Sequence, residues 1–349
     1  MSGHWNGLSV LITGACGTVG RELMRQMIAL APAEIIGIDN NETEIFFLSE
    51  TYRENDNVRI FLGDVRDKQK LLQVTEGVDV VIHAAALKHV ILCEQSPRDP
   101  LQTNIIGTQN VIEAAIENGV KRVIFTSSDK AVNPTNVMGT SKLMGERLIT
   151  AANALRRGTG PIFASTRFGN VLGSRGSVVP IFHQQIARGG PVTITDRGMS
   201  RFIMTVGEAV RLVMDSVFMA HGGEVFVTKM PVARITDLAQ VMIAELAPAY
   251  GFDAADLQIR VIGAKPGEKH YEELMSEEEI RRTVELQRYF AVIPAFKTVY
   301  KSIHYEYEGI VSKSIIRPYN SAQETPLSSE ELRMYLKQSG LLSSVGRTD

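Results

Sequence analysis

The chain has 349 residues, of which 44% are hydrophobic and 22% charged, a composition typical of a soluble globular protein with one large domain and a smaller one. Its net charge of −2 gives no reason to expect a nucleic-acid partner, and its two cysteines are too few for a disulfide framework or a metal site. No apolar run approaches the ~18 residues of a membrane span, and no signal peptide is visible. We therefore expect a cytoplasmic protein without a membrane segment.

The first predicted strand, residues 8–12, leads through three glycines into a helical pattern. Glycines permit a tight turn and the close approach of a pyrophosphate, and the N–H groups at a helix start attract an anion. The pattern predicts a dinucleotide-binding loop. Its expected cofactor contacts are Gly14, Gly17, Thr18, Val19 and Gly20.

The second predicted strand, residues 34–38, ends at Asp39. A carboxylate at this place accepts hydrogen bonds from the adenosine ribose and repels a phosphate, which favours NAD over NADP. The GxxGxxG spacing of the glycine loop resembles that of the extended short-chain dehydrogenase/reductases that act on nucleotide sugars.

The third predicted strand, residues 58–62, precedes Asp64 and Val65. Because ligands bind beyond the carboxyl ends of parallel strands, Asp64 can meet the adenine amino group while Val65 packs on the ring. Alternatively, Asp64 caps a helix that begins near Lys68.

The fourth predicted strand, residues 78–83, runs into three alanines, of which Ala84 and Ala85 are expected to leave space for the cofactor. Lys88 follows closely. Its ammonium either binds a phosphate or sugar oxygen or is a solvated surface group.

Residues 101–117 predict a helix, with Asn104 near its start as a further cofactor residue, and strands are predicted over 122–126 and 162–166. This alternation of strands and helices predicts an α/β fold: a Rossmann-like, doubly wound parallel sheet forming an NAD-binding domain over residues 1–172.

The most informative stretch, residues 127–134, reads Ser-Ser-Asp-Lys-Ala-Val-Asn-Pro and precedes a helix that carries Met138 and Lys142 on one face. Nearly the whole chain resembles the UDP-N-acetylglucosamine 4,6-dehydratases of polysaccharide biosynthesis, in their short soluble form. The segments that carry the resemblance are residues 13–20, 83–90, 127–142 and 168–180.

The resemblance implies oxidation at sugar C4 by NAD, loss of water across C5 and C6, and return of the hydride to C6. It assigns Asp129 and Lys130 as the catalytic pair, with the roles open; in one division Lys130 removes the C5 proton while protonated Asp129 serves the leaving oxygen. Ser128 is placed near sugar O4, and Lys142 at the nicotinamide ribose. The alternative for Asp129 and Lys130 is an exposed turn pair.

Met138 occupies the place of the tyrosine in the superfamily pattern Tyr-x-x-x-Lys. A thioether cannot exchange the C4 hydroxyl proton, so Asp129 or an ordered water is expected to act instead. A subset of the family shares Met-x-x-x-Lys. The other interpretation of Met138 is ordinary core packing.

Substrate and further cofactor contacts are also implied by the resemblance. Residues 263–273 resemble a nucleotide-closing loop, and the arginines suit pyrophosphate oxygens unless they form surface ion pairs. Val171 is expected at the cofactor. The expected substrate contacts are Lys88, Asn170, Arg175, Ser177, Val178, Arg201 and Glu268.

The regular alternation weakens after about residue 175, so residues 173–342 are predicted to form mainly a substrate-binding lobe and a C-terminal arm, with an interleaved boundary. Helices are expected over 237–246, at the surface over 276–284, and from Ser328 onward. Residues 343–349 are expected to be frayed.

Other functions remain open from the residues alone: a nucleotide-sugar 4-epimerase, a dehydratase that inverts C5, or a catalytically silent NAD-binding scaffold marked by Met138. Residues 133–138 favour retention at C5. The resemblance also implies a homo-oligomer, with the helices that start near Asn104 and Met138 at the subunit contacts.

Overall fold

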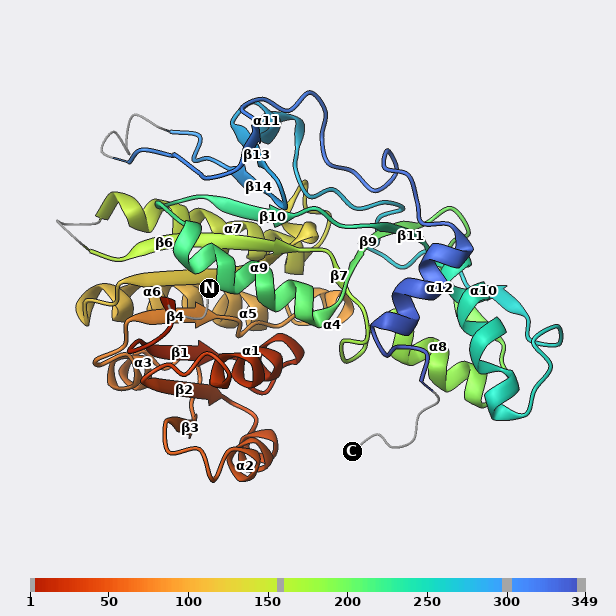
Figure 1. Cartoon of the computed structure of the whole chain (residues 1–349), viewed down its shortest axis with the longest axis horizontal. Helices are drawn as coiled ribbons and strands as arrows, with labels where there is room; N and C mark the ends of the chain where they lie inside the picture. Colours follow the sequence, from red (N-terminus) through yellow and green to blue (C-terminus); the bar gives the residue numbers. More distant parts are fainter. Residues whose placement is uncertain (1–3, 156–159, 297–302, 344–349) are drawn as a thin grey trace. The chain divides into compact units, whose positions relative to one another are not determined.

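The computed structural model describes residues 4–155, 160–296 and 303–343 (Figure 1). The chain divides into two units. Unit 1 comprises 1–168, 209–229 and 275–318, and unit 2 comprises 169–208, 230–274 and 319–349. The first break lies close to the predicted boundary at residue 172. Two later segments return to unit 1, which the sequence interpretation assigned mainly to the other lobe.

Unit 1 is built on a ten-stranded sheet with the order β15-β13-β14-β10-β6-β5-β4-β1-β2-β3. The strands from β10 to β3 pair in parallel, and β14, β13 and β15 continue antiparallel. The predicted Rossmann-like fold is therefore confirmed. The strands are β1 (Ser9–Thr13), β2 (Glu34–Asp39), β3 (Val58–Leu62), β4 (Val80–His83), β5 (Arg122–Ser128), β6 (Ile162–Phe168), β10 (Val225–Thr228), β13 (Thr283–Leu286), β14 (Tyr289–Val292) and β15 (Ile310–Ser312).

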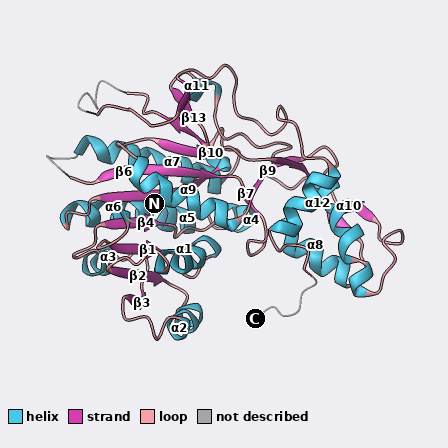
Figure 2. Ribbon diagram, in the orientation of Figure 1, coloured by secondary structure: helices cyan, strands magenta, loops and turns pink. Residues whose placement is uncertain are grey.

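Helices cover both faces of this sheet (Figure 2). Residues of α3 (Lys68–Val74), α6 (Gly107–Glu117) and α7 (Val137–Ala152) share one core cluster with alternate residues of the central strands. The opposite face meets α1 (Thr18–Ile28), whose Met24 lies beside Gly37, and α9 (Val206–Met219), whose Val217 carbonyl accepts a hydrogen bond from Arg122. Shorter elements are α2 (Glu42–Thr51), α4 (Val90–Gln95), α5 (Arg98–Pro100), the π-turn η2 (Leu101–Ile106), the 3₁₀ turns η3 (Asp129–Ala131) and η4 (Asn153–Leu155), and α11 (Glu277–Ile280).

Three local predictions need correction. The helix expected over 101–117 begins as the π-turn η2 before α6. The surface helix expected over 276–284 is wrong in extent, because α11 ends at Ile280 and β13 begins at Thr283. The helix near Lys68 is capped by Asp67 and not by Asp64, since Asp67 accepts the hydrogen bond from the Lys70 amide.

Unit 2 combines three longer helices with two small sheets. The sheets have the orders β11-β9-β7 and β12-β8. Apolar residues of the three helices form its core. The elements are β7 (Asn170–Val171), α8 (Val178–Ala187), β8 (Val192–Ile194), β9 (Ser200–Met204), β11 (Val232–Arg234), α10 (Ile235–Leu246), η5 (Pro248–Tyr250), β12 (Ile259–Val261) and α12 (Ser329–Gln338).

The two helices predicted for unit 2 are present. α10 covers the expected residues 237–246, and α12 follows Ser328, whose side chain caps it in a capping box with Glu331. The predicted frayed tail, residues 343–349, lies outside the described residues except for Ser343. Among the residues with described structure, no helix combines the length and apolar character needed to cross a bilayer.

Candidate active site

The glycine loop joins β1 to α1. Gly14 has a φ of +71°, and a Cβ atom on it would lie 2.7 Å from the Ala85 backbone. A Cβ on Gly20 would lie 2.1 Å from the Gly14 carbonyl oxygen. Gly17 is the N-cap of α1 and has no side chain to cap the helix, which begins with Thr18 and Val19. The loop thus has the backbone that the sequence predicted.

The carboxylate of Asp39 is fixed at the end of β2. Its Oδ2 accepts a hydrogen bond of 3.0 Å from the Cys16 amide, and its Oδ1 accepts one of 3.1 Å from the Asn41 amide. A pocket of about 150 Å³ lies beside it. The pocket is lined by Gly14, Gly17, Ile38, Asp39, Asn40, Gly63, Asp64, Val65, Ala84, Ala85, Ala86, Leu87 and Thr103.

Asp64 lies in this lining, but its carboxylate is bound to Arg66, with Nη2 2.6 Å from Oδ2. The pKa of Asp64 is lowered, chiefly by the hydrogen bonds from the Arg66 side chain. Asn40 donates a further hydrogen bond to the same carboxylate. Val65 beside it is buried. Asp64 is therefore an acceptor that is already partly engaged.

A buried hydrogen-bond chain that sequence reasoning missed connects β1, β4 and α6. The Ala85 amide donates to Thr13 Oγ1, which lies 2.7 Å from His83 Nδ1, while Nε2 lies 3.1 Å from Thr108 Oγ1. Because Thr108 donates its own proton to the Asn104 carbonyl, it accepts from the imidazole. Burial lowers the pKa of His83 to about 3, so the ring is neutral. In the sequence, the signal for this hydrogen-bond chain was His83, a polar residue in an otherwise apolar strand.

Asn104 does not take the place expected of a cofactor contact. Its Oδ1 accepts from the Leu87 amide, and its Nδ2 donates to the Leu87 carbonyl and to Ser141 Oγ. The Asn104 side-chain amide therefore makes its hydrogen bonds within the protein. It pairs with the Leu87 backbone as a neighbouring strand would. Asn104 holds the pocket wall against α7 instead of facing the pocket.

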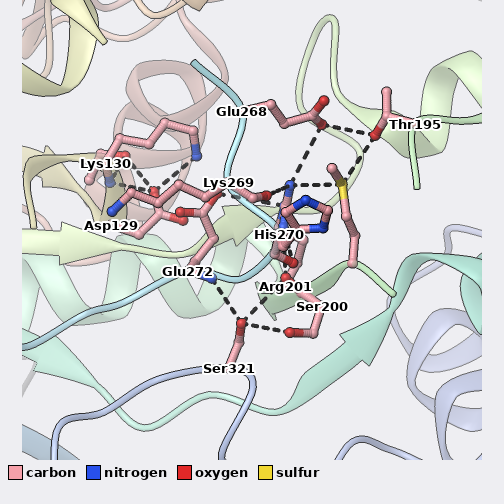
Figure 3. Close-up of polar contacts among 12 residues, drawn as sticks. Asp129, Lys130, Thr195, Ser200, Arg201, Glu268, Lys269, His270, Glu272 and Ser321 are labelled. Carbon is pink, nitrogen blue, oxygen red and sulfur yellow. Dashed lines mark hydrogen bonds and ion pairs between the residues drawn. The ribbon is translucent and has the colours of Figure 1, made fainter. Parts of the chain in front are cut away.

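The strand β5 delivers Asp129 and Lys130 into the turn η3. The Oδ1 atom of Asp129 accepts hydrogen bonds from Ser128 Oγ at 2.7 Å and from Lys130 Nζ at 3.1 Å. Asp129 is 1% exposed, and its Oδ2 is buried without a hydrogen-bond partner in the described structure. The interpretation as an exposed turn pair is therefore wrong: the carboxylate is buried, with one oxygen hydrogen-bonded and the other without a partner among the described residues (Figure 3).

The helix α7 packs directly on this turn. A Cβ on Gly139 would lie 2.2 Å from the Lys130 carbonyl oxygen, so only glycine fits there. Met138 is buried beside it. One turn on, Lys142 Nζ donates to the Thr126 carbonyl at 2.8 Å and lies 4.7 Å from the Phe125 ring centroid. Burial lowers the pKa of Lys142 to about 8.

An ion-pair cluster that was not predicted follows on the same helix. Glu146 on α7 and Glu279 on α11 both bind Arg167 on β6, each through two hydrogen bonds of 2.6–2.8 Å. All three side chains are buried. No local pattern in the sequence pointed to this cluster, because its members are 21 and 112 residues apart.

Four of the predicted substrate residues of unit 2 lie in or near β7 and the start of α8: Asn170, Arg175, Ser177 and Val178. Asn170 lies in β7, and Ser177 is the N-cap residue of α8 without a capping bond from its side chain. Asn170 Oδ1 and Ser177 Oγ are buried without a partner in the described structure. Val178 begins α8, and Arg175 is exposed between these elements. Val171, predicted at the cofactor, pairs with Met204 of β9. Lys88, in unit 1, is exposed.

The guanidinium of Arg201 contacts backbone carbonyls and carboxylates of unit 2 (Figure 3). Its guanidinium donates to the carbonyls of Ser200, Lys269 and His270 at 2.8–3.2 Å. It also lies 3.6 Å from the carboxylates of Glu268 and Glu272. Glu268 in turn accepts a hydrogen bond from Thr195. Arg201 and Glu268 therefore lie together and hold the 263–273 segment in place. The guanidinium of Arg201 is already occupied and is not open to bind a phosphate.

These features agree with a comparison to known families. The model of the family described as "Polysaccharide biosynthesis protein" matches residues 10–294. The chain belongs to this family. Proteins similar to this chain carry different names. An uncharacterised protein of Methanocaldococcus jannaschii, labelled a membrane protein, is 46% identical over 97% of this chain and 98% of its own length.

Two family relatives carry the names of enzymes. A UDP-N-acetylglucosamine 4,6-dehydratase (inverting) of Campylobacter jejuni is 40% identical, over 84% of this chain and 85% of that protein. A UDP-glucose 4-epimerase of Rickettsia massiliae is 36% identical, over 94% of this chain and 95% of that protein.

Solved structures show the same fold. Pen from Bacillus thuringiensis is 40% identical and has a TM-score of 0.90, covering 97% of this chain and 99% of that one. MoeE5, solved with UDP-glucose and NAD, is 25% identical with a TM-score of 0.60, covering 74% of this chain and 87% of that one.

Proposed function

We propose that the protein is an NAD-dependent nucleotide-sugar 4,6-dehydratase that converts UDP-N-acetylglucosamine to a UDP-4-keto-6-deoxy-N-acetylhexosamine. The observation that carries this proposal is the η3 turn, where a buried carboxylate with one available oxygen contacts an ammonium at the carboxyl end of a cofactor-binding sheet. The family's 40% identical dehydratase relative supports the same reaction.

The residues of unit 1 fit NAD. The glycine loop and the start of α1 suit the pyrophosphate, the Asp39 carboxylate suits the adenosine ribose, and the pocket lining leaves room for the adenine. When bound, NAD supplies a hydride acceptor for C4 and a hydride donor for C6. Because the cofactor is regenerated within each cycle, no external redox partner is required.

Asp129 and Lys130 supply the acid and the base. At 3.1 Å the two groups can exchange a proton, so the pair has a neutral form with a carboxylic acid and an amine. In that form Lys130 Nζ takes the C5 proton, which the 4-keto group has acidified, and the Asp129 carboxyl group gives its proton to the C6 hydroxyl. The C6–O bond breaks and water leaves. When the hydride returns to C6, the Lys130 ammonium gives its proton back to C5.

The C4 hydroxyl proton needs a different acceptor, because Met138 is a buried thioether. We assign Ser128 Oγ, which is hydrogen-bonded to Asp129, to contact sugar O4 and to pass that proton to an ordered water, because Asp129 in the neutral pair already holds a proton. Lys142 holds the nicotinamide ribose hydroxyls with the N–H groups that Thr126 does not use. These roles keep each proton transfer within the η3 turn and α7.

The substrate contacts are assigned to Lys88, Asn170, Arg175, Ser177, Val178 and Glu268. The unpartnered oxygens of Asn170 and Ser177 support this assignment, since buried polar atoms usually have a partner. Arg201 would act by shaping the 263–273 segment, and Val171 by contacting the cofactor. We place the enzyme in the cytoplasm as a homo-oligomer, with η2, α6 and α7 at the subunit contacts, where Leu101, Ile106 and Met144 are exposed.

The deciding test is incubation of the purified protein with UDP-N-acetylglucosamine and no added cofactor, followed by mass spectrometry and proton NMR. Loss of one water and a new C6 methyl doublet are expected. The ring couplings report C5: the sequence favours retention, whereas the Campylobacter relative is named an inverting enzyme. An unchanged sugar with NAD still bound would refute the proposal and favour a silent scaffold.

A variant sharpens this test. Asp129→Asn removes the acid with little change of shape, so we expect kcat to fall by at least about a hundredfold with NAD content unchanged. The matched control is Asp215→Asn, which alters another buried carboxylate of unit 1, hydrogen-bonded to the Tyr289 hydroxyl. Equal turnover by the two variants would contradict the assignment.

A second candidate, a 4-epimerase, is favoured by the Rickettsia relative. An epimerase needs C4 oxidation but no leaving-group acid. It would yield an isomer of unchanged mass, so the same mass spectrum separates the two reactions.

A further inference from the structure

Glu146 lies one helical turn after Lys142 on α7 and shares its face. The two side chains form no ion pair in the described structure, and each carboxylate oxygen of Glu146 accepts a hydrogen bond from Arg167. Arg167 Nε lies 2.8 Å from Oε1 and Nη2 lies 2.6 Å from Oε2. Arg167 and Glu146 are 1% and 3% exposed, so water does not screen this carboxylate. Its charge acts on Lys142 without contact.

The Lys142 ammonium has N–H donors beyond the one that binds the Thr126 carbonyl. Its ammonium carries three N–H groups, and in the described structure one of them binds the Thr126 carbonyl while the Phe125 ring lies on another side. An ion pair with a mobile Glu146 would occupy at least one of the remaining donors. The bidentate hold by Arg167 prevents this, and Glu279 fixes Arg167 from its other side with bonds of 2.8 and 2.7 Å.

The charges around Lys142 favour its cationic form. Two carboxylates and one guanidinium give the buried cluster a net negative charge, which the ammonium balances. Among the other groups on elements packed against α7, His83 on β4 is neutral and Asp129 and Lys130 on η3 pair with each other. Glu94 on α4 binds the Val137 amide at the far end of the helix, and Arg282 lies 3.8 Å from Glu279.

We propose that Glu146 is a positioning residue for the reaction: it is the counter-charge that keeps Lys142 an ammonium despite burial, and Arg167 and Glu279 hold it where it cannot occupy the ammonium's donors. This inference rests on the proposed function only for the ligand of Lys142, the cofactor ribose. Burial lowers the pKa of Lys142, and the Glu146 carboxylate raises it, which agrees with this geometry.

The test compares Glu146→Gln with Glu279→Gln. Each variant removes one buried carboxylate from the cluster and leaves Arg167 one full partner, so both should fold with similar losses of stability. The first readout is retention of NAD by the holoenzyme after gel filtration across pH 6 to pH 10. Because this readout does not depend on turnover, it remains valid if the proposed reaction is wrong.

In the wild type, NAD retention should fall as pH rises past the point where Lys142 loses its proton. Glu146→Gln should move that fall to lower pH by about one unit or more, since an opposite charge nearby favours the charged form. Glu279→Gln should leave the pH of this fall near the wild-type value. Glu146→Asp, which keeps the carboxylate, should bring it most of the way back to the wild-type value. Turnover, where measured, should follow the same order.

Two results would overturn the proposal: an unshifted profile in Glu146→Gln, or an equal shift in Glu279→Gln. If Glu146→Gln does not fold, the wild-type protein with ¹³C-labelled lysine gives the Lys142 titration directly, assigned by its absence in Lys142→Arg. An amine already neutral at pH 7 would then refute the inference.

Discussion

Gly139→Ala tests whether the contact between α7 and the catalytic turn positions Asp129 and Lys130. The new Cβ would lie 2.2 Å from the Lys130 carbonyl oxygen, whereas ordinary contact begins at 3.4 Å, so helix and turn must separate by about 1.2 Å (3.4 − 2.2). Overpacking of this kind costs about 1–3 kcal/mol of folding stability. A displacement of about 1 Å at reacting groups costs about a hundredfold in rate.

We therefore expect Gly139→Ala to lower kcat about a hundredfold while NAD content stays near that of the wild type, because the glycine loop is untouched. The control is Gly145→Ala on the same helix, whose Cβ would meet the Phe125 ring at 2.6 Å instead of the turn. It should cost similar stability and less activity. The assays are thermal unfolding, cofactor absorbance and the dehydration rate. Wild-type turnover in Gly139→Ala would refute the reasoning.

Two further predictions concern the cofactor and acid stability. Asp39→Ala should weaken NAD binding about tenfold to a hundredfold in calorimetry, because a charged hydrogen bond contributes about 1.5–3 kcal/mol. The control Asp67→Ala should cost about 1 kcal/mol of stability through loss of the α3 cap alone. Equal affinities of the two variants for NAD would contradict this prediction. Burial would raise the pKa of Glu279, but Arg167 outweighs it and lowers the value from 4.5 to about 2. The carboxylate therefore contributes up to about 3 kcal/mol above pH 4.5, from a shift of 2.5 pH units, and loses it as pH falls toward 2. Denaturant unfolding from pH 6 to pH 2 should show a smaller loss for Glu279→Gln than for the wild type.

The cofactor half of the site was predictable because its residues follow strand ends in sequence. Gly14, Asp39, Val65 and Ala85 each come directly after an apolar run, and parallel strands bring their carboxyl ends to one edge. Local patterns therefore sufficed to assemble the pocket lining. The same reasoning placed Asp129 and Lys130 after β5.

The long-range pairings were not predictable from one sequence. Glu279 was expected on a solvated helix face, yet it is buried against Arg167, 112 residues away. The strand β10 was not assigned to the main sheet, because local pattern does not say which sheet a strand joins. Asn104 and Arg201 carry suitable chemistry, but their hydrogen bonds to Leu87 and to the 263–273 segment depend on tertiary structure.

The return of the chain to unit 1 has a consequence for biosynthesis. When the ribosome has made residues 1–168, β6 is an open sheet edge, and it stays open until Val225–Thr228 has emerged to pair with it. Over the same interval Arg167 and Glu146 lack the third member of their cluster, Glu279. An unpaired apolar strand is a template for aggregation. The β6 edge of the nascent chain is thus open to pairing with other chains until Val225–Thr228 has emerged.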